Sequence, residues 1–219
     1  MRAMILAAGR GQRMGELTDK VPKPLLKVGQ HFLIEYALFS LVKIGIKDVV
    51  INICYRGEQI KKALEDGSRY GIKIYYSEEE SALETGGGIL QALPLLGADP
   101  FIVLSCDVIT DYPLQLLPQQ PQGLAHLVMV DNPPYHRGGD FGLIENKLYL
   151  AEEPRLTFGN IGVYRPELFV NCKPGRFPLS DVLKPAIQQG QITGEYFQGA
   201  WHNLGSAGDL HKAFTQLFS

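Results

Sequence analysis

The first twenty-four residues constrain this chain more than any other stretch. An apolar segment at residues 1–6 predicts a buried strand, and it runs directly into a segment that contains Gly9 and Gly11. Because glycine has no Cβ atom, backbone N–H groups there can point at an anion. Residues 1–27 carry six basic side chains and two acidic ones, although the whole chain has a net charge of −2. These features favour a phosphate-binding loop, with a plain turn carrying solvated cations as the alternative.

Two common phosphate-binding motifs are absent from this segment. The dinucleotide fingerprint G-x-G-x-x-G requires a glycine at the position of Met14, and the next glycine is Gly15. The phosphate-loop motif requires Gly-Lys followed by Ser or Thr, which does not occur here. A phosphate bound at this loop is therefore held by a different arrangement of residues.

The composition is that of an ordinary soluble globular domain. The chain has 219 residues, 45% of them hydrophobic and 20% charged, which is enough for one domain with a substantial core. Its weakly acidic charge argues against nucleic acid as a partner. The three cysteines are widely spaced and indicate neither a zinc knuckle nor a disulfide scaffold. We expect a cytoplasmic protein without a membrane partner, because the N-terminal apolar segment is too short for a signal peptide and no apolar run could span a bilayer.

The apolar pattern predicts alternating strands and helices. In the first half, strands are predicted at 1–6, 49–53, 72–76 and 101–105, and helices at 32–42, 57–64 and 89–93. In the second half, strands are predicted at 124–130 and 157–164, a hairpin at 141–150, and helices at 180–188 and 207–218. This order implies right-handed βαβ units and a largely parallel sheet.

Two further segments have the residue types of a ligand site. The three glycines at 86–88 open the predicted helix 89–93, so a ligand could approach the backbone at a helix N-terminus, with a flexible loop as the alternative. Asp107 follows the strand at 101–105. Open α/β sheets bind ligands at the carboxyl ends of their strands, so this aspartate is a candidate ligand-binding residue. The alternative is a structural aspartate that caps the strand end or the turn after it.

A longer motif joins these features. Residues 6–14 read L-A-A-G-R-G-Q-R-M and are followed by Lys23-Pro24. This combination resembles the signature of the sugar nucleotidyltransferases, L-A-A-G-x-G-x-R-[ML] and then K-P. The likeness runs nearly end to end, and the stretches at 83–88, 98–107, 123–133 and 139–141 resemble the branch of uridylyltransferases that act on N-acetylmuramate 1-phosphate in peptidoglycan recycling.

The resemblance implies a fold, and it assigns the two substrates to different halves of the chain. The expected fold is α/β, a three-layer Rossmann-like nucleotidyltransferase fold (GT-A-like) with a central mixed, mostly parallel sheet. We expect a single nucleotidyltransferase domain over 1–219, with a nucleotide-binding half at about 1–110 and a sugar-binding half at about 111–219.

The resemblance also implies an activity and its partners. A sugar 1-phosphate attacks a nucleoside triphosphate, the form of residues 84–88 favours UTP, and pyrophosphate leaves. Since the attacking phosphate is already an anion, the reaction needs positioning and charge neutralisation rather than a general base.

Site residues are carried over position by position from the family motifs. The expected catalytic residues are Arg13, Lys23 and Asp107. The expected nucleotide-binding residues are Leu6, Ala8, Gly9, Gly11, Arg13, Lys23, Glu84, Thr85 and Gly86. The expected sugar-binding residues are Gly139, Asp140 and Asn160, although the order of residues 158–160 departs from the family.

The resemblance further implies magnesium (Mg²⁺) as the cofactor, with Asp107 and Asn203 as its protein ligands. The family motif W-x-D-x-G-[TS] stands here as W-H-N-L-G-S at 201–206, so an amide replaces the usual second carboxylate. We hypothesise that magnesium binds more weakly in this chain than in its relatives. His202 is a poor ligand for so hard a cation.

Other functions stay open at this point. One is a mannose-1-phosphate guanylyltransferase, or a thymidylyl- or cytidylyltransferase that acts on another sugar or alcohol phosphate. Another is a nucleotide-binding protein with impaired catalysis, which only Asn203 suggests. A nicotinamide-dependent oxidoreductase is disfavoured by Gly15 and by Asn52, which stands where an acidic ribose contact would be expected.

Overall fold

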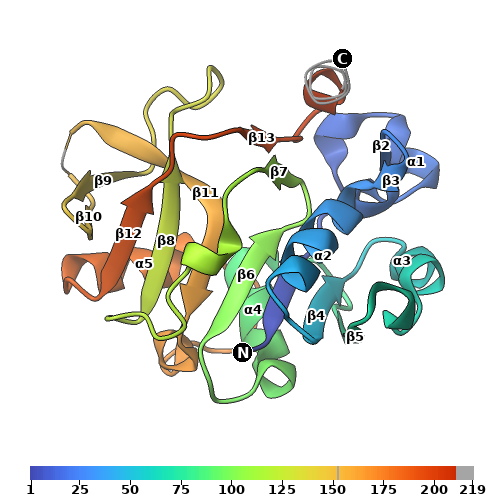
Figure 1. Cartoon of the computed structure of the whole chain (residues 1–219), viewed down its shortest axis with the longest axis horizontal. Coiled ribbons are helices and arrows are strands. Elements are labelled where there is room, and N and C mark those ends of the chain that lie inside the picture. The colour runs from blue at the N-terminus through green and yellow to red at the C-terminus, as the bar shows by residue number, and fades with distance from the viewer. Residues whose placement is uncertain (152, 211–219) are drawn as a thin grey trace.

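The structure, a computed structural model, describes residues 1–151 and 153–210. Its centre is a nine-stranded sheet in the order β5-β4-β1-β6-β11-β8-β12-β10-β9 (Figure 1). In chain order these strands are β1 (Ala3–Leu6), β4 (Asp48–Ile53), β5 (Lys73–Glu78), β6 (Phe101–Ser105), β8 (Ala125–Val130), β9 (Phe141–Ile144), β10 (Lys147–Tyr149), β11 (Arg155–Tyr164) and β12 (Ile192–Tyr196).

The two halves of the sheet pair differently. Strands β5, β4, β1 and β6 are all parallel, as the alternating pattern predicted. Strand β11 is antiparallel to both β6 and β8, while β8 and β12 are parallel and β9 and β10 form the predicted hairpin. The predicted mixed α/β sheet is confirmed. The expectation that it is mostly parallel holds for the N-terminal half, whereas antiparallel pairing predominates in the C-terminal half.

Helices cover both faces of the sheet, which gives three layers. Successive residues of β1 point to opposite faces. Ala3 and Ile5 pack in the core cluster formed with α2 (Leu33–Lys43) and α3 (Gly57–Leu64), whereas Met4 packs in the cluster formed with α4 (Glu84–Leu96) and α5 (Ser180–Gln188). Because both faces of these strands are buried, the strands read as continuous apolar runs in the sequence.

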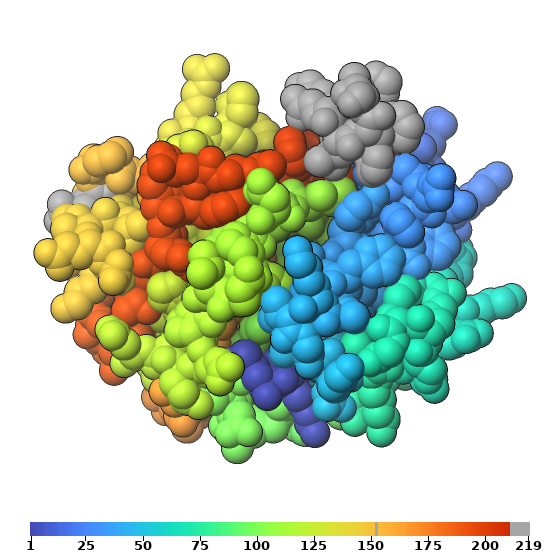
Figure 2. Space-filling model, in the orientation of Figure 1, coloured from blue at the N-terminus to red at the C-terminus, as the bar shows by residue number. Residues whose placement is uncertain are grey.

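Two short strand pairs lie outside the main sheet, and sequence reasoning missed both. Strand β7 (Val108–Thr110) pairs with β13 (Trp201–Asn203), and β2 (Lys27–Val28) pairs with β3 (His31–Phe32). The β7–β13 pair places the segment after residue 200 directly beside the end of β6. Figure 2 shows the red residues around β13 lying on the surface against the green residues around β7.

Short helical turns complete the described chain. They are α1 (Leu17–Lys20) and the 3-10 helices at Gln12–Met14, Lys23–Leu25, Ser68–Tyr70, Leu114–Leu116 and Pro166–Phe169. None of the helices within residues 1–151 and 153–210 is both long and apolar enough to cross a membrane.

Most predicted elements agree with the structure to within two residues at each end, whereas α4 differs at both ends and finishes at Leu96 instead of residue 93. Helices α3 and α5 have the predicted bounds, but α4 begins at Glu84, five residues before the predicted start. The three glycines therefore lie inside the helix, because tertiary contacts there outweigh their low helix propensity. Of the predicted closing helix at 207–218, residues 211–218 lie outside the described residues.

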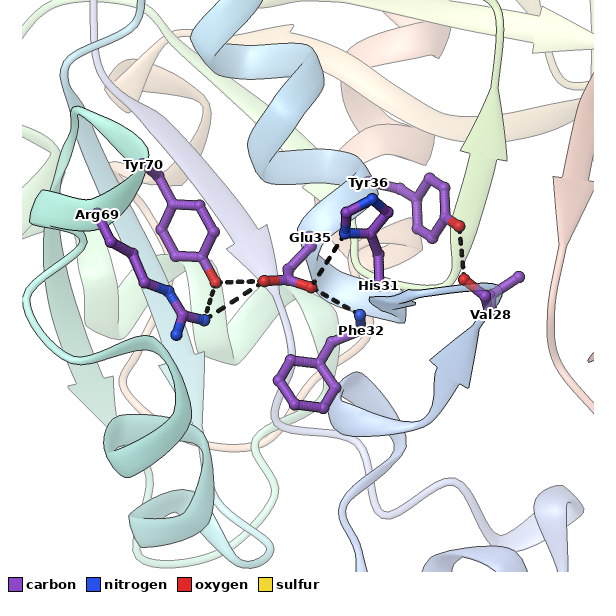
Figure 3. A network of polar contacts seen from close by, with 7 residues as sticks. All are labelled: Val28, His31, Phe32, Glu35, Tyr36, Arg69 and Tyr70. Atoms are coloured by element: carbon purple, nitrogen blue, oxygen red, sulfur yellow. Dashed lines mark hydrogen bonds and ion pairs between the residues drawn. The ribbon is translucent and has the colours of Figure 1, made fainter.

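A buried carboxylate holds α2 to its neighbours. Glu35 Oε2 accepts a hydrogen bond from the Phe32 backbone N–H at 2.7 Å, at the start of α2 (Figure 3). Its Oε1 accepts the hydroxyl of Tyr70 at 2.5 Å and lies 3.3 Å from Arg69 Nη2. Burial and the Glu35 carboxylate raise the pKa of Tyr70 to about 12, so the phenol remains a donor at neutral pH. One carboxylate thus joins the helix to the turn before β5.

Replacing this carboxylate should destabilise the fold. Glu35→Ala removes the acceptor of the Phe32 N–H and of the Tyr70 hydroxyl, which are partly buried, so we expect it to lower the free energy of unfolding by roughly 1–3 kcal/mol in urea denaturation. Glu58→Ala is the matched control, because Glu58 pairs with Lys61 on an exposed surface and should lose far less. Equal stability of the two variants would show that the Glu35 contacts do not hold the helix.

Candidate active site

The candidate site lies where the parallel strands end. Leu6 at the end of β1 is opposite both Asn52 of β4 and Ser105 of β6, so three strand ends share one edge. A cavity of about 660 Å³ opens at this edge. Its lining includes ten of the predicted residues, namely Leu6, Ala8, Gly9, Gly11, Arg13, Lys23, Glu84, Thr85, Asp107 and Asn160. This is the place where open α/β sheets bind ligands.

The two glycines of the first loop have different roles. Gly11 has φ +71°, and a Cβ atom there would lie 3.0 Å from Cβ of Lys23, so the tight turn requires glycine. At Gly9 a Cβ atom would meet no protein atom of the described chain within 4 Å. Gly9 therefore faces open space in the cavity, and the packing of the loop does not explain why it lacks a side chain.

A buried ion pair lies at the centre of the cavity. Lys23 is only 8% exposed, and its Nζ donates to Asp107 Oδ2. The other oxygen, Oδ1, accepts the hydroxyl of Ser105 at 2.5 Å. Arg13 brings a second cation, since its guanidinium lies against Gly205, where a Cβ atom would come within 3.0 Å of Nη2. Beside the glycine loop, the cavity thus brings the Arg13 guanidinium close to the Lys23–Asp107 pair, an arrangement that suits a polyanionic ligand with a bound cation.

The cavity also contains a polar pair that sequence reasoning missed as part of the site. Asn52 and Glu79 are both buried, and Asn52 Nδ2 donates to Glu79 Oε1 at 2.7 Å. Asn52 Oδ1 accepts the Ala7 N–H at 2.9 Å, and Glu79 Oε2 accepts the Leu83 N–H at 2.9 Å. The pair therefore links the first loop to the segment before α4. A polar residue inside the apolar run of β4 was the available signal for Asn52.

Cys106 is excluded as a nucleophile. It is buried beside Asp107, and burial, followed by the charge of Asp107, raises the pKa of its thiol to about 12. At neutral pH the thiol is protonated, and the thiolate is the reactive form. Cys106 therefore packs in the core as a small apolar residue.

Gly86 and Gly87 of α4 pack against residues 175–178 of the same chain. The N–H groups of Gly86 and Gly87 both donate to the carbonyl oxygen of Phe177 at 3.1 Å. A Cβ atom at Gly86 would lie 2.4 Å from the Phe177 ring, and one at Gly87 would lie 2.2 Å from the Gly175 oxygen. Gly86 does not line the cavity, whereas Glu84 and Thr85 do. The close backbone approach predicted here is thus made by residues 175–178.

A second hollow of about 360 Å³ adjoins the first and shares Thr85 and Asn160 with it. Asp140 lines this hollow, and its Oδ2 accepts the Phe158 N–H at 2.8 Å. Asn160 has φ +57° at a β-bulge in β11, a strained conformation of the kind found at functional sites. The indole of Trp201 donates to the Gly159 carbonyl at 2.9 Å and so holds the bulge.

Gly139, the third residue predicted to bind the sugar, does not line this hollow. It has φ +60°, and a Cβ atom there would lie 2.9 Å from Arg155. The turn before Asp140 therefore needs glycine for its own packing.

The predicted metal ligands lie on neighbouring backbone segments, but Asp107 lines the larger cavity, whereas Asn203 lines two adjoining hollows and not that cavity. Across the β7–β13 pair Asn203 is opposite Val108, and the Leu204 N–H donates to the Asp107 carbonyl at 2.8 Å. Asn203 Oδ1 is buried and has no hydrogen-bond partner in the described part of the chain. No group of three or more His, Cys, Asp and Glu side chains within the described residues could hold a metal alone. One carboxylate and one free amide oxygen fit a hard cation that takes its other ligands from phosphates and water.

The fold and these charges define an α/β enzyme that handles phosphates. A profile of the nucleotidyl transferase family matches residues 2–219. The chain belongs to this family and is a nucleotidyltransferase. Nucleotidyltransferases of this family generally use a divalent metal.

Relatives in sequence and structure agree with this family. The chain is 44% identical to N-acetylmuramate alpha-1-phosphate uridylyltransferase of Neisseria meningitidis, over 97% of this chain and 96% of that protein. It is 30% identical to mannose-1-phosphate guanyltransferase of Aspergillus oryzae over 96% of this chain, but spans only 62% of that protein.

Two solved structures share the fold at 19% identity. A putative glucose-1-phosphate thymidylyltransferase from Bacillus anthracis gives a TM-score of 0.86 and covers 99% of this chain and 95% of its own. An inositol-1-phosphate CTP transferase from T. maritima gives 0.82 and covers 98% and 93%.

Adding a methyl group at Gly87 should destabilise the protein, because the Gly175 carbonyl oxygen occupies that space. We expect Gly87→Ala to lower the free energy of unfolding by roughly 1–3 kcal/mol in urea denaturation, although alanine is the better helix former. A variant as stable as the wild type would mean that residues 175–178 do not pack against α4 in solution.

Proposed function

We propose that this chain transfers the uridylyl group of UTP to N-acetylmuramate 1-phosphate and releases pyrophosphate, with magnesium as its cofactor. The observation that carries the proposal is the convergence of Arg13, Lys23 and Asp107 beside the glycine loop in one cavity. The choice of base and sugar is supported by the 44% identity to the Neisseria enzyme over almost the whole of both chains. A place in cell-wall sugar recycling is part of the same proposal.

The two hollows suggest how the substrates divide between the halves of the chain. We assign the nucleotide to the larger cavity and to residues 1–110, where the first loop offers backbone contacts and Glu84 and Thr85 face the base and ribose. We assign the sugar to the smaller hollow and to residues 111–219, where Asp140 and Asn160 face it. Gly86 and Gly139 support these contacts through the packing of α4 and of the turn before Asp140.

The reaction then needs no general base. An anionic oxygen of the sugar phosphate attacks the α-phosphorus of UTP, and the bond from that phosphorus to the bridging oxygen breaks as pyrophosphate leaves with the electron pair. Arg13 and Lys23 attract the triphosphate and neutralise the charge that develops on the leaving group. Asn160, which lines both hollows, is placed to orient the attacking phosphate.

Magnesium would be held by Asp107 and Asn203 together with substrate phosphates and water. When bound, it supplies charge neutralisation at the phosphates. Lys23 pairs with Asp107 in the structure, so the lysine ammonium neutralises this carboxylate in the protein alone.

A mannose-1-phosphate guanylyltransferase is the second candidate, because such enzymes are also relatives over most of this chain. One experiment separates the two. Pyrophosphate release is measured with magnesium for UTP, GTP, CTP and dTTP, each against N-acetylmuramate, glucose and mannose 1-phosphates. We expect turnover with UTP and the muramate substrate. Turnover confined to GTP with mannose 1-phosphate would replace the proposed substrates, and no release with any pair would overturn the proposal.

A methyl group at Gly9 should test the nucleotide site without disturbing the fold. Because no atom of residues 1–151 and 153–210 lies within 4 Å of that position, we expect Gly9→Ala to keep the wild-type Tm and to raise the KM for UTP roughly tenfold, equivalent to about 1.4 kcal/mol. Gly138→Ala is the control, since its Cβ atom also meets open space but outside either hollow. An unchanged KM for Gly9→Ala would place the nucleotide elsewhere.

A further inference from the structure

We propose that Arg176 is a positioning residue that holds the Glu84 carboxylate toward the ribose of the nucleotide, so that the carboxylate accepts hydrogen bonds from the ribose hydroxyls. This inference rests on the proposed function, because it places a nucleotide in the larger cavity. Arg176 lies outside the family motifs. The inference assigns the choice between ribonucleotides and deoxyribonucleotides to the Glu84 side chain.

The first observation is the backbone conformation of Glu84, which is unfavourable for its residue type. Its φ is +60°, in the left-handed region, where the side chain of an L-amino acid crowds the backbone and glycine does not. Residues other than glycine persist in such a conformation where their surroundings or a function require it. Glu84 also lines the larger cavity. The position therefore keeps a side chain at a cost in stability, beside the proposed nucleotide.

The second observation is the partner of this side chain. Arg176 Nε donates to Glu84 Oε1 at 2.9 Å, and Arg176 Nη2 lies 2.8 Å from the same oxygen. The backbone beside Arg176 is held as well, since the Phe177 N–H donates to the Leu83 carbonyl at 3.1 Å. Neither side-chain contact uses Glu84 Oε2, so this oxygen can accept from a ligand. The pair thus gives the carboxylate a defined direction at the cavity.

Stability does not account for this ion pair. The side chain of Arg176 is 70% exposed and that of Glu84 is 37% exposed, and solvent screens an ion pair at such a surface. The pair therefore contributes little to offset the left-handed conformation, and glycine at position 84 would avoid that strain. A requirement for a carboxylate in the cavity explains both the strain and the partner.

The chemistry of the nucleotide indicates which group the carboxylate binds. A carboxylate repels the triphosphate, which Arg13 and Lys23 attract, so it suits only the uncharged part of the ligand. The uracil edge offers one N–H between two carbonyl oxygens, and those oxygens would repel a carboxylate. The ribose offers two neighbouring hydroxyl donors, and an acidic residue on a ribose hydroxyl is a recurrent contact in nucleotide-binding folds. Arg176 balances the charge of Glu84 and so limits its repulsion of the triphosphate.

The test measures how strongly the enzyme prefers a complete ribose. Values of kcat/KM are determined with magnesium and saturating sugar phosphate for UTP and for its 2′-deoxy and 3′-deoxy forms. We expect the wild type to prefer UTP over at least one deoxy form by about tenfold or more, because the Glu84 carboxylate then lacks its donor. In Glu84→Gly we expect this preference to fall below about threefold, since glycine brings no acceptor. Its Tm should stay close to that of the wild type, because glycine relieves the left-handed strain.

A double-mutant cycle tests the role of Arg176. We expect Arg176→Met to lower the ribose preference about threefold or more in the wild-type background, because the carboxylate loses its direction. In the Glu84→Gly background the same change should have less than about a twofold effect on that preference. Arg176→Lys, which keeps the charge, should retain part of the preference.

A matched control is available at Glu145. This residue also has a left-handed backbone, with φ +53°, but it lies between β9 and β10 and lines neither hollow. Glu145→Gly should relieve the same kind of strain and leave the ribose preference unchanged. An unchanged preference in Glu84→Gly, or equal effects of Arg176→Met in both backgrounds, overturns the inference. A shift in preference among UTP, CTP and GTP with the ribose preference intact places the carboxylate at the base and overturns it as well.

Failure of the proposed function is distinguishable from failure of this inference. If the enzyme uses GTP instead of UTP, the proposed substrate fails, and the ribose preference is measured with GTP and its deoxy forms. If no nucleotide is turned over, the ratio of Kd values for UTP and its deoxy forms, from titration calorimetry, replaces the ratio of kcat/KM. A wild-type ratio near one in either measurement overturns the inference.

Discussion

The ion pair between Lys23 and Asp107 is the contact on which the rest of the site depends. Lys23 comes from the loop after β1 and Asp107 from the end of β6, and both side chains are largely buried. A buried charge that loses its partner costs several kcal/mol, so each residue holds the other in place. The pair therefore joins the basic loop to the sheet edge. Gly9, Gly11 and Arg13 of that loop line the same cavity as the pair. A single interaction thus links the N-terminal motif with the centre of the fold.

This pair also couples the two ligands of the proposed reaction. In the protein alone one lysine balances one carboxylate. A triphosphate bound near Lys23 would draw that ammonium toward its own negative charge, and the carboxylate would then need another cation. Magnesium bound near Asp107 would release the lysine in the same way. In the proposed reaction each ligand would therefore improve the binding of the other, and by linkage the coupling would be equal in both directions.

The sequence predicted those features that depend on local patterns. Buried strands read as apolar runs, α3 and α5 agree in both bounds, and the first loop lies at the cavity as its glycines and cations indicated. The start of α4 could not be predicted, because the Phe177 carbonyl that binds its first N–H groups comes from about ninety residues away. The β7–β13 pair was missed for a related reason, since three-residue strands carry no periodic pattern. Glu79 gave no local signal at all.

Asn203 shows how one substitution changes two properties of a site at once. Replacing a carboxylate by an amide removes a negative charge, which weakens the attraction for a divalent cation but also lessens the repulsion of the incoming triphosphate. The same replacement gives the ligand a direction, because only one end of an amide can bind a metal. Charge can be supplied by the substrate phosphates, whereas direction has to come from the protein.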